Sequence, residues 1–172
     1  IPLIRKFACG YKQGAKAANA DIEILENMTG TTPADCKDPA KGAELAQGQI
    51  DRGADVIYHA AGGTGMGVIR AAADADKLAI GVDSNQNMIA PGHVLTSMLK
   101  RVDVAAYDTL TDAMQGAFTP GVVTLGLAEE GVDWAVDEHN EPILTDEIRS
   151  AVETAKEKII AGEIAVHNYE TD

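Results

Sequence analysis

The chain of 172 residues is long enough to bury one sizeable core, and 45% of its residues are hydrophobic, which excludes an intrinsically disordered protein. Its net charge of −13, with no basic cluster longer than Lys100-Arg101, argues against nucleic acid and anionic membrane surfaces as partners. Aromatic residues make up only 4%, so the core must consist of Ala, Val, Ile and Leu, which suits helices packed on a parallel sheet.

The first third of the chain alternates between helical and strand patterns. Apolar or small residues at nearly helical spacing predict a helix over residues 1–20, and alternation predicts a short strand over residues 21–27. Asp38 followed by Pro39 is typical of a helix start, and this helix should run to about Arg52 and end at Gly53. The apolar run that follows predicts a buried strand.

The same alternation continues to the end of the chain. Strands are expected over residues 54–61, 78–83, 93–100 and 121–127. Helices are expected over residues 66–76, 102–115 and 145–161, with Thr145 near the start of the last one. Residues 128–144 are expected to form a long loop. The pattern predicts an α/β fold: a doubly wound, Rossmann-like parallel sheet with helices on both faces and right-handed crossovers.

Ligands of such sheets bind at the carboxyl ends of the strands, and this rule selects three places in the chain. They are the glycine turn GGTGMG after Ala61, Asp83 with the loop that follows it, and Lys100. An aspartate can accept two hydrogen bonds side by side from the vicinal hydroxyls of a sugar, but it can also cap its own loop. Lys100 is either a surface lysine or a cation that reaches into the same crevice toward Asp83.

The glycine turn does not match a P-loop, because Met66 and Val68 stand where that motif needs a lysine. It fits a dinucleotide fingerprint only with a shifted frame, and the sixth position fails, so this interpretation is the weakest. Two stronger interpretations remain open. The glycines either allow close packing of a strand and a helix, or they present N–H groups at the start of the helix to a polar small molecule.

The sequence offers little support for catalysis, a cofactor or a metal site. It lacks a G-x-S-x-G motif, and its four histidines have no metal-ligand spacing among themselves or with the two cysteines. His59 lies in a predicted buried strand and is expected to be a core residue with its hydrogen bonds satisfied. Cys9 and Cys36 allow one disulfide, although two separate thiols are the favoured interpretation.

Three segments closely resemble one known family. They are DPAKGAELAQGQIDRGADVIYHAAGGTGMGVIRAA, AIGVDSNQN and VLTSMLKRVD, which begin at Asp38, Ala79 and Val94. The resemblance is to the basic membrane lipoprotein family, the substrate-binding proteins of nucleoside-type ABC transporters. It implies two lobes of the type I periplasmic-binding-protein kind that close around one ligand, with this chain as the second half. Residues 1–101 would form the ligand-binding lobe. Residues 102–172 would supply a crossover helix, a hinge strand and a C-terminal helix that pack partly on the first lobe.

The resemblance also implies a function without enzymatic activity. The ligand would be a nucleoside, of the purine class or a related nucleobase compound, and the partner would be the membrane permease of an ABC transporter. A lipid anchor on an upstream segment would hold the protein in the periplasm or at the cell surface. Without the first lobe, apolar surface from residue 102 onward should be exposed and should favour homodimers of the chain.

Matching positions assign site residues under this resemblance. Asp83 and Lys100 resemble the family's pair that holds the ribose hydroxyls, and Gly62 and Gly63 would offer backbone groups to the ligand. Cys36 stands where family members often carry an aromatic ring that stacks on the purine. Stacking must then come from the other lobe, or from Phe7 or Trp134 in this chain, or the ligand is not a purine nucleoside.

Two alternatives from other classes remain open at this stage. One is an α/β enzyme that acts on a nucleoside or sugar phosphate and uses Asp83 and Lys100 as an acid–base pair. The other is an intracellular regulator that senses a ligand with the same lobes.

Overall fold

The computed structural model describes residues 2–169, so Ile1 of the first predicted helix and residues 170–172 of the expected C-terminal segment lie outside the described part. The helices are α1 (Pro2–Ala18), α2 (Pro39–Ile50), α3 (Gly65–Asp74), α4 (Val102–Gln115) and α5 (Asp146–Ile160). The strands are β1 (Val56–Tyr58), β2 (Leu78–Asp83), β3 (Val94–Lys100) and β4 (Val132–Trp134). The predicted α/β alternation is therefore confirmed for most of the chain.

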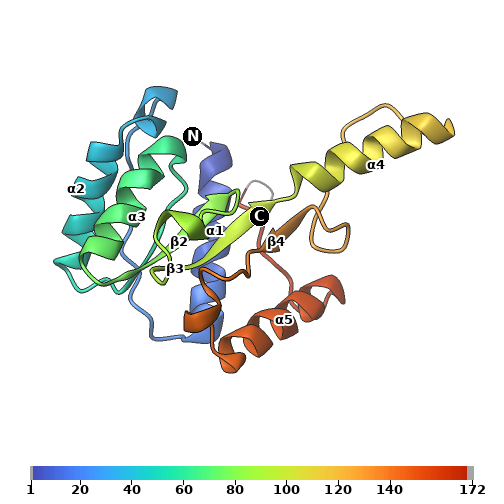
Figure 1. Ribbon diagram of the computed structural model, residues 1–172. Coiled ribbons are helices and arrows are strands. Elements are labelled where there is room, and N and C mark those ends of the chain that lie inside the picture. Colours follow the sequence, from blue (N-terminus) through green and yellow to red (C-terminus); the bar gives the residue numbers. More distant parts are fainter. Residues whose placement is uncertain (1, 170–172) are drawn as a thin grey trace.

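The four strands form one mixed sheet in the order β1-β2-β3-β4. The first three strands are parallel, and β4 is antiparallel to β3. The buried core lies between this sheet and helices α2 and α3, and is built from Ala46, Ile57, Val68, Ile69, Ala72, Ala79 and Val94. Helix α1 lies on the other face (Figure 1). There the ring of Tyr11 in α1 contacts the ring of Tyr58 in β1. Helices thus cover both faces of the sheet, as predicted.

Two helix starts follow the local chemistry of the sequence. The Asp38 side chain accepts a hydrogen bond from the backbone N–H of Lys41 at 3.0 Å, and Pro39 occupies the first helical position of α2. The hydroxyl of Thr145 accepts a hydrogen bond from the N–H of Ile148 at 3.2 Å at the start of α5. Both caps satisfy a backbone donor that would otherwise lack a partner, and both were predicted.

The predicted strands over residues 21–27 and 121–127 are wrong. In the described part of the chain neither segment joins the sheet, because an alternating pattern supplies one apolar face but a strand also needs a neighbour to pair with. The first segment is held instead by α2, where the Gln49 amide donates to the Asn27 side chain at 2.9 Å. The predicted loop over residues 128–144 contains β4, which occupies the outer edge of β3 with Met98 opposite Trp134.

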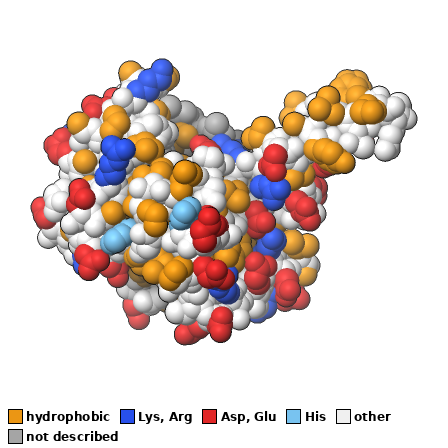
Figure 2. Space-filling model, in the orientation of Figure 1, with side chains coloured by type: hydrophobic (Ala, Val, Ile, Leu, Met, Phe, Trp, Pro, Cys, Tyr) orange, Lys and Arg blue, Asp and Glu red, His pale blue; other side chains and the backbone are white. Residues whose placement is uncertain are grey.

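Helix α4 extends away from the sheet and its helices (Figure 1). Large apolar side chains lie exposed on this helix and on the segment after it, as the space-filling view of the projecting arm shows (Figure 2). They are Val102, Tyr107, Leu110, Met114, Phe118, Val122 and Val123.

Among the residues that the structure describes, no helix combines the length and the apolar character that crossing a bilayer requires.

Candidate functional site

The carboxyl ends of β2 and β3 bring Asp83 and Lys100 together. Each is the last residue of its strand, and the parallel register places Asp83 opposite Leu99. The Lys100 Nζ lies 2.8 Å from Asp83 Oδ1, while the Lys100 and Asp83 side chains remain 45% and 53% exposed. The carboxylate and the ammonium therefore form an ion pair that still has free hydrogen-bonding capacity toward solvent.

Asp83 also has an uncommon backbone conformation. Its φ of +68° lies in the left-handed region, which aspartate tolerates better than most residues but which still costs on the order of 1 kcal/mol. The next residue turns back at once, because the N–H of Ser84 donates to the carbonyl of Val82 at 2.9 Å. This tight turn lies at the end of β2, where the Asp83 carboxylate pairs with Lys100.

Two aromatic residues lie beside the ion pair. The Lys100 Nζ lies 4.8 Å from the centroid of the Phe7 ring, within the range of a cation–π contact. Tyr58, at the end of β1, has a raised pKa because burial disfavours its ionised form and because the Asp83 carboxylate is near. Phe7 was predicted as a site residue, whereas Tyr58 was missed. Its position as the last residue of the strand beside β2 is the signal that could have found it.

The glycine turn contacts Cys36. A Cβ added to Gly62 would lie 3.2 Å from the Cys36 carbonyl oxygen, and one added to Gly63 would lie 3.3 Å from it. Gly62 has a φ of +55°, so a side chain there would be both crowded and strained. The buried Thr64 hydroxyl joins the two segments, because it accepts from the N–H of Asp38 at 2.9 Å and donates to the carbonyl of Asp35 at 2.8 Å.

The predicted site residues therefore form two groups. In the first group Lys100 contacts both Asp83 and Phe7, and Cys36, Gly62 and Gly63 make up the second. Both cysteines of the chain are free thiols. Trp134, the other aromatic candidate, donates from its indole nitrogen to Glu153 of α5 at 2.9 Å. It thus contributes to the attachment of α5, as the packing interpretation expects.

His59 was expected to be a satisfied core histidine, and the structure corrects half of that expectation. The residue is buried, with 4% of its surface exposed, and its Nε2 lies 2.9 Å from Gln86 Oε1. Its Nδ1 is also buried but has no hydrogen-bond partner among the described residues. Burial lowers the pKa of His59, and the Gln86 contact and the Asp83 carboxylate offset this only in part.

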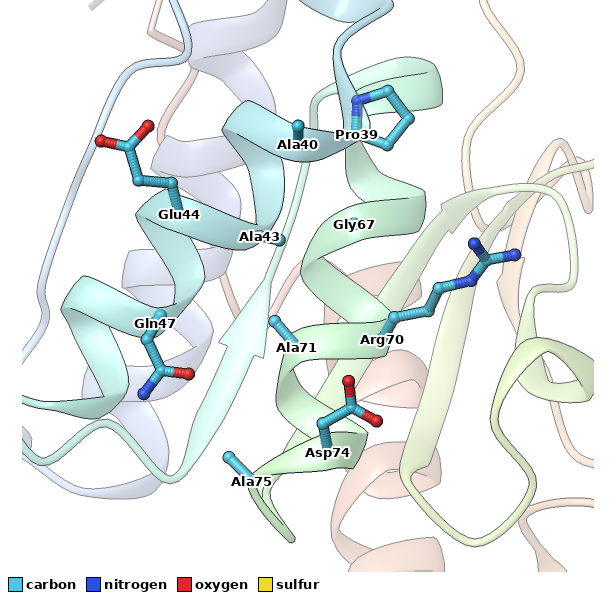
Figure 3. A pocket seen from close by; sticks show the side chains of 10 residues that line it. All are labelled: Pro39, Ala40, Ala43, Glu44, Gln47, Gly67, Arg70, Ala71, Asp74 and Ala75. Carbon is cyan, nitrogen blue, oxygen red and sulfur yellow. The ribbon is translucent and has the colours of Figure 1, made fainter.

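A groove of about 740 Å³ lies elsewhere, on the outer surface between α2 and α3 (Figure 3). Small residues such as Ala43 and Ala71 line its floor, with Arg70 and Asp74 at its side. It contains none of the predicted site residues, which lie at the strand ends.

In the described part of the chain, no group of three or more His, Cys, Asp and Glu side chains is placed to hold a metal ion.

Comparison with known proteins gives consistent results. The family model described as "ABC transporter substrate-binding protein PnrA-like" matches residues 1–170. The ABC transporter nucleoside-binding protein BmpA of Lactococcus lactis subsp. cremoris is 34% identical over 182 residues, which cover 95% of this chain and 49% of that protein. An uncharacterized lipoprotein of Pyrococcus abyssi is 36% identical over 148 residues, which cover 80% of this chain and 36% of that protein.

The fold comparison agrees with the sequence comparisons. The crystal structure of an ABC transporter system solute-binding protein from Aeropyrum pernix matches with a TM-score of 0.81 and 28% identity. The match covers 99% of this chain and 57% of that one. The expected solute-binding-protein lobe is thus confirmed. The chain spans about half the length, or less, of these relatives.

Proposed function

Because the chain belongs to the PnrA-like family of ABC transporter substrate-binding proteins, we propose that it forms the ligand-binding half of a two-lobed binding protein of an ABC importer. The ligand is a nucleoside, of the purine class or a related nucleobase compound, held in a cleft between the lobes. The family consists of transporter binding proteins and not of enzymes, as expected from the sequence. The acid–base interpretation of Asp83 and Lys100 therefore loses its basis.

The observation that carries this proposal is the half-exposed ion pair at the strand ends. The Asp83 carboxylate can accept two hydrogen bonds from the vicinal hydroxyls of a ribose, and the Lys100 ammonium can donate to one of the same oxygens. The two charges neutralise each other, which suits an uncharged sugar better than a phosphate. An exposed pair adds little to folding stability, about 1 kcal/mol at most, so its main contribution is to recognition.

The glycine turn supplies the second wall of the proposed cleft. Gly62 and Gly63 expose their backbone beside Cys36, which has no ring face to offer a purine. The Phe7 ring lies against the Lys100 ammonium. We therefore assign Phe7 to holding Lys100, and we assign base stacking to the other lobe.

The exposed apolar side chains on α4 support a second lobe. This helix projects away from the sheet, and the chain spans only about half the length of its relatives. Residues from 102 onward thus pack in part on a further lobe.

The Pyrococcus abyssi relative is a lipoprotein, which supports a lipid anchor and a location in the periplasm or at the cell surface. The remaining partner is the membrane permease of the transporter.

Titration calorimetry on the two-lobed protein tests the proposal. Adenosine, guanosine and inosine should bind, and 2′-deoxyadenosine should bind about 10- to 100-fold more weakly than adenosine, because it lacks one hydroxyl that the charged pair contacts. Adenosine monophosphate is the control for charge and should also bind more weakly. Equal affinity for adenosine and its 2′,3′-dideoxy analogue would refute the role of the ion pair. If the two-lobed protein binds none of the nucleosides tested, the proposed ligand class is wrong.

A further inference from the structure

The side-chain oxygen of Gln86 connects the end of β2 with the residue that follows β1. It accepts a hydrogen bond from the backbone N–H of Val82, the residue before Asp83, at 2.9 Å. The same oxygen lies 2.9 Å from the Nε2 of His59, which follows β1. An amide oxygen can only accept, so His59 must carry its proton on Nε2 and donate it. If the amide were turned over, two N–H groups would face each other.

The His59 ring is held firmly in this orientation. It is almost fully buried, and its Nδ1 and Cε1 edge packs against Gly65 so closely that any Cβ on Gly65 would overlap with the ring. Burial disfavours the charged form and keeps the ring neutral. A neutral ring with its proton on Nε2 leaves Nδ1 as an acceptor, and no residue in the described part of the chain donates to it. His59 thus acts as a fixed donor to Gln86.

Gln86 is also attached to the third strand. Its backbone N–H donates to the hydroxyl of Ser97 in β3 at 2.9 Å, and that hydroxyl donates to the side chain of Asn87 at 2.8 Å. One residue therefore connects the residue after β1, the end of β2 and the middle of β3. We call the contacts of Gln86 with His59 and Val82 the Gln86 bridge.

Val82, which the Gln86 bridge contacts, directly precedes Asp83, the residue with the left-handed backbone. A φ of +68° at Asp83 persists only if the surrounding contacts require it. Release of the Val82 N–H would let the turn after β2 relax, and the Asp83 carboxylate would move away from Lys100. Neither His59 nor Gln86 has to contact the ligand for this effect.

We propose that His59 and Gln86 are positioning residues, which fix the Asp83 carboxylate for the two hydroxyls of the ligand through the shared oxygen of Gln86. This inference rests on the proposed function for its effect on binding. The placement of Asp83 itself can be measured without a ligand.

The experiment compares four single variants and one double variant with the unchanged protein. Gln86→Met removes the shared oxygen at similar size, and His59→Leu removes the donor. His59→Gln keeps an N–H donor and is the conservative replacement. Gln47→Met, at an exposed glutamine of α2, is the control for loss of an amide. Two quantities are measured: adenosine affinity of the two-lobed protein, and the three-bond HN–Hα coupling of Asp83 by NMR of the 172-residue chain, which reports its φ.

Gln86→Met and His59→Leu should each lower adenosine affinity by about tenfold, the equivalent of part of one charge-assisted hydrogen bond, and should change the Asp83 coupling. His59→Gln and Gln47→Met should leave both quantities near those of the unchanged protein. The double variant His59→Leu/Gln86→Met should be no weaker than Gln86→Met alone, because both changes remove the same bridge.

Unchanged affinity and unchanged coupling in His59→Leu and Gln86→Met would overturn the inference, even if both variants melt at a lower temperature. If the unchanged protein binds no nucleoside, the proposed function is wrong. The HN–Hα coupling of Asp83 in the variants then still shows whether His59 and Gln86 fix its backbone. If Gln86→Met does not fold, the comparison of His59→Leu with His59→Gln carries the test.

Discussion

The ammonium of Lys100 lies over the ring of Phe7, 4.8 Å from its centroid, so helix α1 contacts the same cation that pairs with Asp83. Phe7 lies one helical turn before Tyr11, whose ring packs on Tyr58 of the sheet. The packing of α1 on the sheet therefore also determines where Lys100 is held. Two of the residues that the sequence suggested as ligand contacts in fact contact each other.

We expect Phe7→Leu to weaken adenosine binding by a few-fold, because a half-exposed cation–π contact contributes about 0.5–1 kcal/mol. Phe7→Trp should retain the affinity, since indole is the better ring for a cation. Calorimetry with adenosine and with ribose separates two roles. If Phe7 acts through Lys100, both ligands lose affinity by the same factor. A loss for adenosine alone would instead favour stacking of Phe7 on the base.

Asp83→Asn should reduce adenosine affinity about 10- to 100-fold, because an amide replaces the charged acceptor of two hydroxyls. Folding stability should change by less than about 1 kcal/mol, since the ion pair with Lys100 is half exposed. Asparagine also tolerates the left-handed backbone at this position. Asp103→Asn, which breaks the exposed pair with Arg101, is the matched control and should leave affinity unchanged. An Asp83→Asn variant with the affinity of the unchanged protein would contradict the assigned role.

The convergence of Asp83 and Lys100 could be predicted from the sequence, because the carboxyl ends of neighbouring parallel strands share one edge of the sheet. The same rule does not supply pairing partners. Residues 21–27 have the right alternation, yet they stay outside the sheet, while the short strand β4 appears in a predicted loop. Strand pairing depends on which edge is free, and periodicity along one segment does not contain that information.

The Gln86 bridge could not be predicted for a related reason. In the sequence, Gln86 is one polar residue in a polar loop, and His59 lies in a predicted buried strand. Their shared contact depends on a turn whose central residue, Asp83, adopts a left-handed backbone that a bulky side chain avoids. Only the three-dimensional arrangement brings the two side chains within 2.9 Å.

The free energy of unfolding should depend on pH through His59. Burial lowers its pKa below the ordinary value of 6.5, with the Gln86 contact and the Asp83 charge acting in the opposite direction. Below pH 6.5 the unfolded chain binds a proton at His59 that the folded chain does not bind. The free energy of unfolding therefore falls as the pH falls toward the lowered pKa of the folded chain. The slope from one such group is at most about 1.4 kcal/mol per pH unit.

Urea unfolding between about pH 8 and about pH 5 measures this effect, with His59→Gln as the variant that lacks the titrating group. The stability of the unchanged chain should fall more steeply below pH 6.5 than that of His59→Gln. Asp137 does not interfere: although burial opposes its ionisation, hydrogen bonds from Asn85, His139 and Asn87 lower its pKa below the ordinary 3.8. Its contribution is therefore lost only in more acidic solution. Parallel pH profiles would contradict the prediction.

Two glycines on the packed helices should respond in opposite directions to alanine. A Cβ on Gly67 would overlap with the carbonyl of Pro39, where α3 and α2 approach each other beside the groove of Figure 3, so Gly67→Ala should destabilise the chain by about 1–3 kcal/mol. Gly48 in α2 has open space around it, and Gly48→Ala should stabilise the chain by about 0.5–1 kcal/mol. Thermal unfolding of the two variants checks both signs. A Gly67→Ala chain as stable as the unchanged chain would mean that the two helices pack less closely.

The exposed face of α4 should make the isolated 172-residue chain self-associate. Tyr107, Leu110 and Met114 follow one another at helical spacing, and the last two are 65% and 89% exposed. Such an apolar stripe is costly in water and is covered either by a second lobe or by a second copy. Sedimentation velocity should therefore show dimers or larger species that grow with concentration. Leu110→Lys with Met114→Lys should shift the chain toward monomer, whereas Met88→Lys, at a methionine that is 69% exposed on a separate turn, should not. A chain that stays monomeric at every concentration would mean that this face does not need a partner, and the argument for a covering lobe from α4 would fall with it.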